Sequence, residues 1–365
     1  MNNFAKVEKG MDISMAENER YLIRADGNAT IGMGHVMRCM SVAMALRQLN
    51  KEVYFVTACE ECISVIRKEG FEVFLLSTNY HEMESELPEL LRIVKEKNIK
   101  LVLVDSYQVT QHYFHELHKH IAVAYLDDLG NSFDADGVIN YNIYGPQMRY
   151  EQQLQQVLGA SYVPLRKEFA GEQGCQQVSP SVRHVLITTG GSDACFAAKG
   201  FTDTFLQSKV ATEQGIVIHV VSGPFNQFKD ELKSLYQGNP RVCIHENVTN
   251  MKALMQTCDV ILTSAGSTIY EVCALGIPMI CFYFVENQKR NAEGIAALTS
   301  VVNVGNYAKD AKAVCSKARE VLERCIEHVA YREQLHREEK QIVDGNGAMR
   351  IAQALTEMGK RCETR

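Results

Sequence analysis

A histidine inside a glycine-rich segment is the first candidate for chemistry in this chain. The segment Ile31–Arg38 (IGMGHVMR) follows the apolar run Tyr21–Ile23 and precedes the helical pattern Cys39–Leu46. This order predicts that His35 lies where a glycine turn enters a helix. Glycines let a substrate approach the backbone closely, and a helix N-terminus favours negative charge. Because a histidine there is suited to take a proton near neutral pH, we predict that His35 is catalytic.

One neighbour and two alternatives bear on this prediction. Arg38 lies one turn further along the same helix face and would pair with Asp26 or with a charge on the substrate. The alternative for His35 is a structural histidine that bonds to backbone at a helix start. A dinucleotide site is disfavoured, because Met37 stands where the fingerprint needs its third glycine.

A second glycine-rich segment, Thr263–Glu271 (TSAGSTIYE), is suited to bind a diphosphate. Its Gly-Ser-Thr helix start offers free backbone N–H groups and two hydroxyls, and Glu271 stands one turn on, where it can accept hydrogen bonds from a ribose diol. No Walker lysine is present, which argues against P-loop ATPase chemistry. The alternative is an ordinary N-cap followed by an exposed glutamate. A further turn after a predicted strand, Gly190–Ser192, favours the ligand site.

Polar residues that follow other predicted strands extend the candidate site. Asn287 and Gln288 follow an apolar run, and their amides suit sugar hydroxyls and acetamido groups, although a plain polar loop is the alternative. Asp105 follows the buried-type strand Leu101–Val104. Since parallel sheets bind ligands beyond the carboxyl ends of their strands, we expect Asp105 to lie near a ligand.

Three other groups contain residue types that can bind metals or undergo redox chemistry. The pair Asp127-Asp128 has no further ligand cluster nearby, so capping or loop hydrogen bonds are favoured. The histidines between positions 112 and 120 favour a solvated helix face, because no cysteine or carboxylate completes a zinc pattern. Cys59-Glu60-Glu61-Cys62 is a lone C-x-x-C with an acidic middle. We therefore predict neither a metal nor another cofactor.

Strands and helices alternate twice along the chain, which indicates an α/β protein with two parallel sheets. The apolar runs lie at 21–23, 53–56, 73–76, 101–104, 122–126 and 138–139, and again at 184–188, 216–221, 242–244, 260–262 and 279–283. We predict an N-terminal extension (1–19), a domain with His35 (20–163), a linker (164–181), a second domain (182–342), and a closing helix and tail (343–365).

Bulk properties are consistent with two globular domains. The chain has 365 residues, is 46% hydrophobic and 22% charged, and carries a net charge of -6. The negative charge argues weakly against nucleic acid as a partner. No apolar run approaches the ~20 residues of a membrane helix, and the first 19 residues are polar, so we expect no membrane insertion and a cytoplasmic location. The twelve cysteines are scattered through apolar segments, which favours free thiols.

In their order, these motifs resemble those of the UDP-sugar hydrolases of pseudaminic acid biosynthesis. The matching segments are Ile23–Asp26, Gly32–Arg38, Asp105–Tyr107, Gly190–Asp193, Ser264–Thr268 with Glu271, and Asn287–Gln288. That family is related to the peptidoglycan N-acetylglucosaminyltransferase. The resemblance implies its GT-B-type fold, in which two Rossmann-like domains have parallel sheets that face a central cleft.

The resemblance also implies an activity. Water would attack the anomeric carbon of UDP-2,4-diacetamido-2,4,6-trideoxy-β-L-altropyranose and release the free sugar and UDP without a metal, with His35 as the base that activates the water. The expected substrate contacts are Gly34, Arg38, Asp26, Tyr107, Asn287 and Gln288. The expected UDP contacts are Gly190, Gly191, Ser192, Val248 by its backbone near the uracil, Ala265, Gly266, Ser267, Thr268 and Glu271.

Two alternatives stay open beside this hydrolase. A glycosyltransferase with a UDP-N-acetylated sugar donor would need an acceptor pocket, and Met33–Leu46 shows no clear apolar or basic patch for a lipid acceptor. A non-catalytic nucleotide-sugar-binding protein is the other alternative. A nucleoside diphosphate leaves without needing a proton, so a histidine without a paired acid suffices for hydrolysis. The expected partner is a UDP-sugar, and the sequence leaves the oligomeric state open.

Overall fold

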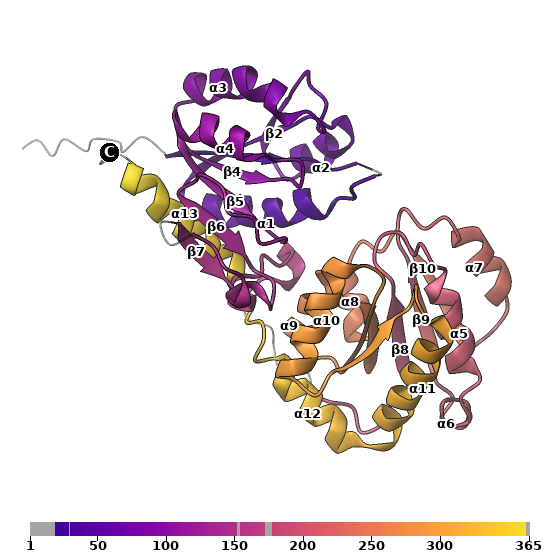
Figure 1. Cartoon of the computed structure of the whole chain (residues 1–365). Coiled ribbons are helices and arrows are strands. Elements are labelled where there is room, and N and C mark those ends of the chain that lie inside the picture. Colours follow the sequence, from indigo (N-terminus) through magenta and orange to yellow (C-terminus); the bar gives the residue numbers. More distant parts are fainter. Residues whose placement is uncertain (1–18, 29, 152–153, 172–176, 363–365) are drawn as a thin grey trace, which may run out of the picture.

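Two parallel β-sheets, each flanked by helices, form two α/β domains (Figure 1). The computed structural model describes residues 19–28, 30–151, 154–171 and 177–362. Within them the strand orders are β3-β2-β1-β4-β5-β6-β7 and β10-β9-β8-β11-β12-β13. The predicted fold class is confirmed. The predicted N-terminal extension lies outside the described residues except for Glu19, as do residues 172–176 of the predicted linker and residues 363–365 of the tail.

The strands of the first sheet are β1 (Arg20–Ala25), β2 (Glu52–Thr57), β3 (Glu72–Leu75), β4 (Ile99–Asp105), β5 (Ala122–Leu126), β6 (Gly137–Asn140) and β7 (Gln155–Leu158). The strands of the second sheet are β8 (His184–Thr188), β9 (Val217–Ser222), β10 (Val242–Glu246), β11 (Val260–Ser264), β12 (Met279–Tyr283) and β13 (Val302–Asn306).

The helices that precede β8 are α1 (Gly34–Gln48), α2 (Ile63–Lys68), α3 (Leu87–Glu96) and α4 (Gln111–His118). Those that follow β8 are α5 (Ala197–Leu206), α6 (Lys209–Glu213), α7 (Lys229–Tyr236), α8 (Met251–Gln256), α9 (Thr268–Leu275), α10 (Glu286–Leu298), α11 (Ala311–Glu327), α12 (Val329–Glu339) and α13 (Gly347–Cys362).

Strand β1 shows why the apolar runs become central strands. Residues 21–25 are all buried, and β1 pairs in parallel with β2 on one side and β4 on the other. A strand covered on both faces needs apolar side chains at consecutive positions, so the run Tyr21–Ile23 has no polar alternation. Arg24, which follows it, is buried because it pairs with Glu86. Helix α1 and the late helix α13 pack together beside this sheet, and Figure 1 shows α13 alongside the N-terminal domain. The closing helix therefore belongs in space to the first domain.

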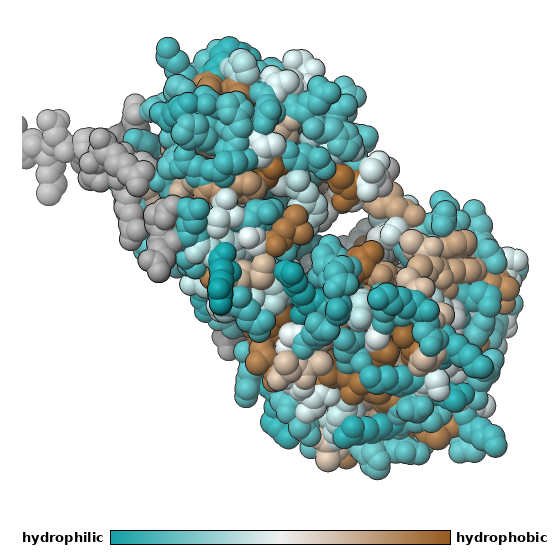
Figure 2. Space-filling view, viewed as in Figure 1, coloured by the Kyte–Doolittle hydropathy of each residue, from teal (hydrophilic) through white to brown (hydrophobic). Residues whose placement is uncertain are grey.

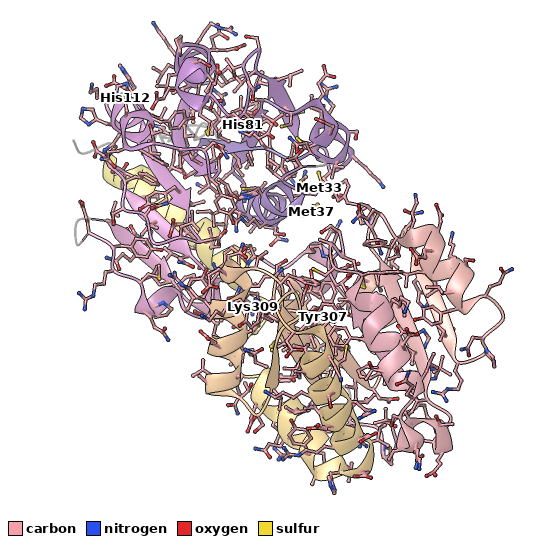
Figure 3. All side chains as sticks on the ribbon, turned by 45° about the vertical axis from the view of Figure 1, so that its right-hand side comes forward. Met33, Met37, His81, His112, Tyr307 and Lys309 are labelled. Atoms are coloured by element: carbon pink, nitrogen blue, oxygen red, sulfur yellow. The ribbon has the colours of Figure 1, made fainter. Side chains whose placement is uncertain are left out.

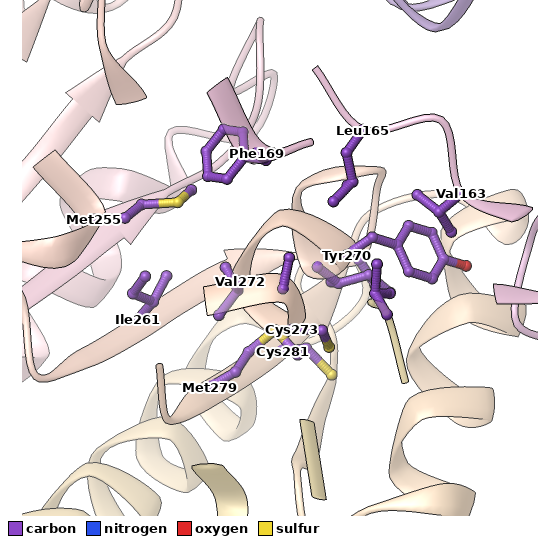
Figure 4. Close-up of a cluster of buried hydrophobic side chains, with 14 of the residues drawn as sticks. Val163, Leu165, Phe169, Met255, Ile261, Tyr270, Val272, Cys273, Met279 and Cys281 are labelled. Atoms are coloured by element: carbon purple, nitrogen blue, oxygen red, sulfur yellow. The ribbon is translucent and has the colours of Figure 1, made fainter. Parts of the chain in front are cut away.

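The two passages of the chain between the domains run side by side. Gly171 N donates to Gly345 O at 2.9 Å, and a side chain at Gly347 would collide with the backbone of Val163. In the first passage, apolar side chains pack against α9 of the second domain, as Figure 4 shows for Val163 and Leu165 beside Tyr270. This packing fixes the segment that carries Arg166 against the C-terminal domain.

Candidate active site

A cleft of about 820 Å³ lies between the two domains. Loops at the carboxyl ends of β1, β4 and β5 line one wall, and loops that follow β8, β9, β11 and β12 line the other. Figure 2 shows the hollow between the domains, with hydrophobic side chains at its edges. Met33 and Met37 line it from the N-terminal domain, and Figure 3 shows both beside the gap. Of the predicted site residues, only Asp26 and Asp105 do not line this cleft.

His35 stands in the first turn of α1, which begins at Gly34. Gly32 has a φ of +75°, and its N–H donates to Asn28 O, so a glycine-dependent turn leads into the helix as expected. The His35 side chain is 11% exposed, and its Nδ1 lies 2.6 Å from Asp105 Oδ1. The ring of Tyr107 packs edge-on against the imidazole with centroids 4.7 Å apart. The histidine is thus held at the cleft wall by a carboxylate and an aromatic ring.

Asp105, at the end of β4, is buried beneath His35 and Arg38. Arg38 Nε and Nη2 each donate to the Asp105 carboxylate at 2.6 Å. Burial alone would raise the pKa of Asp105, but Arg38 and then His35 outweigh it and hold that pKa well below its usual range. Asp105 is therefore a buried carboxylate that stays ionised.

A second carboxylate, Asp128, lies on the other side of Arg38. It accepts from Arg38 Nη1 at 2.8 Å, from the Tyr107 hydroxyl at 2.6 Å and from Asn142 Nδ2 at 2.7 Å. The sequence favoured loop hydrogen bonds for the pair Asp127-Asp128. That holds for Asp127, which accepts from Gly130 N, and for Asp128, which accepts from the loop residues Tyr107 and Asn142. What the sequence did not predict is the pairing of Asp128 with Arg38. Asp105 and Asp128 meet at one arginine because β4, which Asp105 ends, and β5, which Asp128 follows, are neighbours in the sheet. Knowledge of this strand order would have predicted the pairing.

The predictions for Asp26 need correction. Asp26 does not line the cleft and does not pair with Arg38. Its carboxylate instead accepts from Thr57 Oγ1 and Ala58 N, and it lies 2.6 Å from Arg24 Nη1. The physical reason is that Asp26 comes directly after β1 and lies beside the end of the neighbouring strand β2, inside the N-terminal domain. There it accepts hydrogen bonds from the last residue of β2 and from the residue that follows it. We therefore assign Asp26 a structural role.

The opposite wall consists mainly of turns. Gly190, after β8, has a φ of +88°, and a Cβ at Gly223 would lie 2.5 Å from the carbonyl oxygens of Gly190 and Gly191. After β11, Ala265 N donates to Phe282 O at 2.8 Å, which anchors the turn that leads into α9. These predicted UDP-binding turns, together with Val248, face the cleft. Their close backbone packing leaves N–H groups and hydroxyls for an anion.

Glu271 lines the cleft, but in this structure an arginine engages it. Arg166 donates to the two carboxylate oxygens of Glu271 at 2.6 and 2.9 Å, and Arg166 also lies 3.4 Å from Glu168. Burial raises the pKa of Glu271, although Arg166 opposes that shift. No motif in the sequence pointed to Arg166, which lies in the predicted linker and reaches the site only because that segment packs on α9.

The amides of α10 reach both the cleft and the other domain. Asn287 and Gln288 line the cleft, and Gln288 Oε1 accepts from Phe284 N. One turn on, Asn291 Nδ2 donates to Asn142 Oδ1 at 3.3 Å, and its Oδ1 accepts from the Tyr270 hydroxyl. These contacts tie α9 and α10 to the loop after β6, directly behind Asp128.

The other cysteine and histidine groups lie outside this cleft. Cys59 and Cys62 are buried free thiols, and burial raises the pKa of Cys59 to about 11. His115 and His118 both bond to Asp134, a carboxylate partner that the sequence did not reveal. Among the described residues, no group of three or more His, Cys, Asp or Glu side chains is arranged to hold a metal ion. No helix among them is long and apolar enough to cross a membrane.

Several known proteins are similar in sequence to this chain over most of its length. It is 29% identical over 284 residues to "Uncharacterized protein MJ1062" of Methanocaldococcus jannaschii, covering 73% of this chain and 56% of that protein. It is 24% identical to "Spore coat polysaccharide biosynthesis protein SpsG" of Bacillus subtilis, covering 92% and 97%. It is 25% identical to "UDP-2,4-diacetamido-2,4,6-trideoxy-beta-L-altropyranose hydrolase" of Campylobacter jejuni, covering 76% and 96%.

The C-terminal half and the whole fold also have known counterparts. Residues 185–349 match the Glycosyltransferase family 28 C-terminal domain. The crystal structure of Acinetobacter baumannii MurG superposes with a TM-score of 0.67 over 93% of this chain and 99% of that one, at 13% identity. The fold is therefore of the GT-B type. The glycosyltransferase domain and the enzyme names of relatives support an enzyme with a glycosyltransferase-like fold.

Proposed function

We propose that this protein hydrolyses a UDP-linked diacetamido trideoxy sugar, UDP-2,4-diacetamido-2,4,6-trideoxy-β-L-altropyranose, to the free sugar and UDP, in the biosynthesis of a nonulosonate such as pseudaminic acid. The observation that carries the proposal is a histidine held by a carboxylate across a cleft from two glycine turns and a helix N-terminus. The named activity of the Campylobacter jejuni relative supplies the substrate.

In the proposed reaction, water attacks the anomeric carbon while His35 takes one of its protons. The bond from that carbon to the UDP oxygen breaks, and UDP leaves with the electron pair. General base catalysis by one positioned side chain contributes ~10²–10⁴-fold. The leaving diphosphate is stabilised by helix N-terminal N–H groups and hydroxyls rather than by a protonated acid. A single base therefore suffices, and the step requires no metal.

The C-terminal wall would hold the nucleotide. Gly190, Gly191 and Ser192 offer one turn, and Ala265 to Thr268 offer a second at the start of α9. Glu271 is the proposed ribose ligand. Its carboxylate has further lone pairs beside those that Arg166 uses, so the two roles are compatible. Arg166 adds positive charge to this side of the cleft.

The sugar would lie between the two walls. Tyr107, whose hydroxyl is fixed by Asp128, faces it from the N-terminal domain, and Asn287 and Gln288 face it from α10. Amide groups donate and accept at once, which suits acetamido substituents. Met33 and Met37 offer apolar contact to methyl groups on the sugar.

The test is incubation of the purified protein with UDP-diacetamido sugars, without any acceptor and with a chelator present. Release of UDP together with the free sugar supports the hydrolase. Turnover that appears only when an acceptor is added would replace it with a glycosyltransferase, the candidate that the matched glycosyltransferase domain favours. Binding of UDP without turnover of any such sugar would leave a nucleotide-sugar-binding protein.

A further inference from the structure

Arg38 is engaged almost entirely by its own domain. It makes two hydrogen bonds to Asp105, one to Asp128 and one to the Tyr141 hydroxyl, and its Nη2 also lies 3.2 Å from His35 Nδ1. An arginine has five N–H donors, so these bonds leave little capacity for a substrate. Its side chain is 11% exposed. The geometry thus argues for an internal cation rather than the substrate contact that the sequence predicted.

This cation sits between two carboxylates, each of which holds one ring at the cleft. Asp105 contacts the His35 imidazole, and Asp128 accepts from the Tyr107 hydroxyl. The two rings contact each other edge-on. One arginine therefore organises two of the side chains with which the N-terminal domain lines the cleft, His35 and Tyr107.

An ionised carboxylate accepts hydrogen bonds and cannot donate them. His35 Nδ1 lies 2.6 Å from Asp105 Oδ1 and 3.2 Å from Arg38 Nη2, which is a donor. The contact with the carboxylate is much the shorter, and it is a hydrogen bond only if Nδ1 carries the hydrogen. In a neutral imidazole the other nitrogen, Nε2, then has the free lone pair. We propose that Asp105 is a positioning residue that fixes His35 in the Nδ1–H tautomer, and that Arg38 serves this role by keeping Asp105 charged.

The catalytic consequence of this inference rests on the proposed function, whereas the tautomer does not. If Nε2 carried the hydrogen, His35 would present a donor to the cleft and could not take a proton from water. A wrong tautomer of a catalytic histidine costs up to ~10⁴-fold in turnover in a hydrolase with a similar His–Asp pair. Asp105 touches neither water nor sugar in this scheme, so it acts through His35.

The first experiment reads the tautomer directly in the full-length protein. Histidine labelled with ¹⁵N reports which ring nitrogen is protonated, and the signals of His35 are those lost in His35→Asn. We expect a protonated Nδ1 and an unprotonated Nε2 when the imidazole is neutral. A protonated Nε2 would overturn the proposal. Because this measurement needs only the unaltered protein and one assignment variant, it is decisive even if changes at Asp105 impair folding.

The second experiment is a double-substitution cycle with UDP release as the readout. Asp105→Asn should lower kcat by about 10²–10⁴-fold and leave UDP affinity within about threefold. Added to His35→Asn, it should cost no more than about threefold further, because groups that act as a unit are not additive. If the losses of kcat in the two single variants multiplied in the double variant, or if UDP affinity fell in parallel, Asp105 would have a merely structural role and the proposal would be overturned. An Nδ1–H tautomer in a protein that hydrolyses no UDP-sugar would refute the proposed function and leave the role of Asp105 intact.

Discussion

The two walls of the cleft present different chemical groups. The N-terminal wall is a network of charged side chains, in which Arg38 joins the buried carboxylate of Asp105 and the half-buried carboxylate of Asp128 to His35 and Tyr107. The C-terminal wall is mostly backbone, with tight glycine turns and the start of α9, and Arg166 and Glu271 are its charged pair among the described residues that line the cleft.

This difference matches two different tasks. A proton transfer needs a side chain with a defined tautomer and little freedom, which buried hydrogen-bonded charges provide. A diphosphate needs several N–H donors at fixed positions, which turns and helix starts provide without a titrating group. The comparison therefore predicts that the walls are functionally separable, with turnover on one side and nucleotide affinity on the other.

The largest expected effect is on the N-terminal wall. His35→Asn should reduce the rate of UDP release by about 10²–10⁴-fold, because the base is lost. UDP affinity measured by calorimetry should stay within about threefold, since the nucleotide turns belong to the other domain. His112→Asn is the matched control: His112 is exposed on α4, and Figure 3 shows it on the far side of the N-terminal domain. Unchanged turnover in His35→Asn would remove His35 from the mechanism.

The converse substitution lies on the C-terminal wall. In Gly223→Ala the new Cβ would press on the carbonyl oxygens of Gly190 and Gly191, so the turn after β8 must shift. We expect UDP affinity to fall by about 10- to 100-fold, equal to about 1.4–2.8 kcal/mol. The rate at saturating substrate should change much less.

Gly359→Ala, in α13, controls for the glycine change itself, because its Cβ meets its nearest neighbour, Tyr21, at an ordinary contact distance of 3.4 Å. This control should bind UDP like the unaltered protein. The separation of the walls would be refuted if Gly223→Ala lowered turnover at saturation while UDP affinity remained intact.

The sequence predicted the fold better than it predicted the side-chain network around Arg38. The central strands have continuous apolar runs and were found, whereas β7 (QQVL) and β13 (VNVGN) were missed. Both are edge strands, which pair on one side only and can carry polar residues. Unlike the other edge strands, β3 and β10, they contain no apolar run of three residues. The closing helix, predicted within residues 343–365, spans Gly347–Cys362.

For the site, spacing along the chain located the turns but not the partners. Asp105 and Asp128 are separated by 23 positions in sequence and meet at Arg38 only because β4 and β5 are neighbours in the sheet. Strand order is a property of the assembled sheet, and the apolar runs do not encode it. Arg166 could not be predicted either, because it contacts Glu271, 105 positions away in sequence, only in the folded structure.

A smaller effect tests what Glu271 contributes to the C-terminal wall. If Glu271 holds the ribose, Glu271→Gln should lower UDP affinity by about tenfold, since a hydrogen bond to a charged group is lost. The affinity for 2′-deoxy-UDP should fall less, so the ratio of the two affinities reports the ribose contact. Any change caused by freeing Arg166 affects both nucleotides equally and cancels in the ratio.

Glu168→Gln is the control for this ratio, because Glu168 also pairs with Arg166 but does not line the cleft. It should leave the preference for UDP over 2′-deoxy-UDP unchanged. An equal preference in Glu271→Gln and in the unaltered protein would mean that Glu271 serves only to hold the linker arginine.

The smallest expected effect is on how the stability of each domain depends on pH. It comes from histidines that lie away from the cleft, His219 in the C-terminal domain and His118 in the N-terminal domain. In the C-terminal sheet, His219 lies 2.9 Å from His184 on one side and 2.9 Å from His245 on the other. Burial, with these neighbours, lowers the pKa of His219 to about 4. In the N-terminal domain, hydrogen bonds from the His118 ring to the carboxylates of Asp136 and Asp134 raise the pKa of His118 despite partial burial. The domains should therefore respond to pH in opposite directions.

The direction follows from which state binds more protons. Between about pH 6.5 and about pH 4, unfolded His219 is protonated while folded His219 is not, so acidification destabilises the C-terminal domain, on the order of 1 kcal/mol after solvent screening. The stability that His118 contributes is complete below its unfolded pKa and is lost as pH rises through its higher folded pKa.

Hydrogen exchange resolved by domain can follow both responses, and each variant should remove only one of them. His219→Gln should flatten the acid-side loss of protection in the sheet β8–β10, while His118→Gln should flatten the alkaline-side loss around α4. If both domains lost protection together in acid, and His219→Gln changed neither, the three-histidine row would not be the source of the acid sensitivity. The opposite signs make this a test of local chemistry, because a general effect of net charge would move both domains the same way.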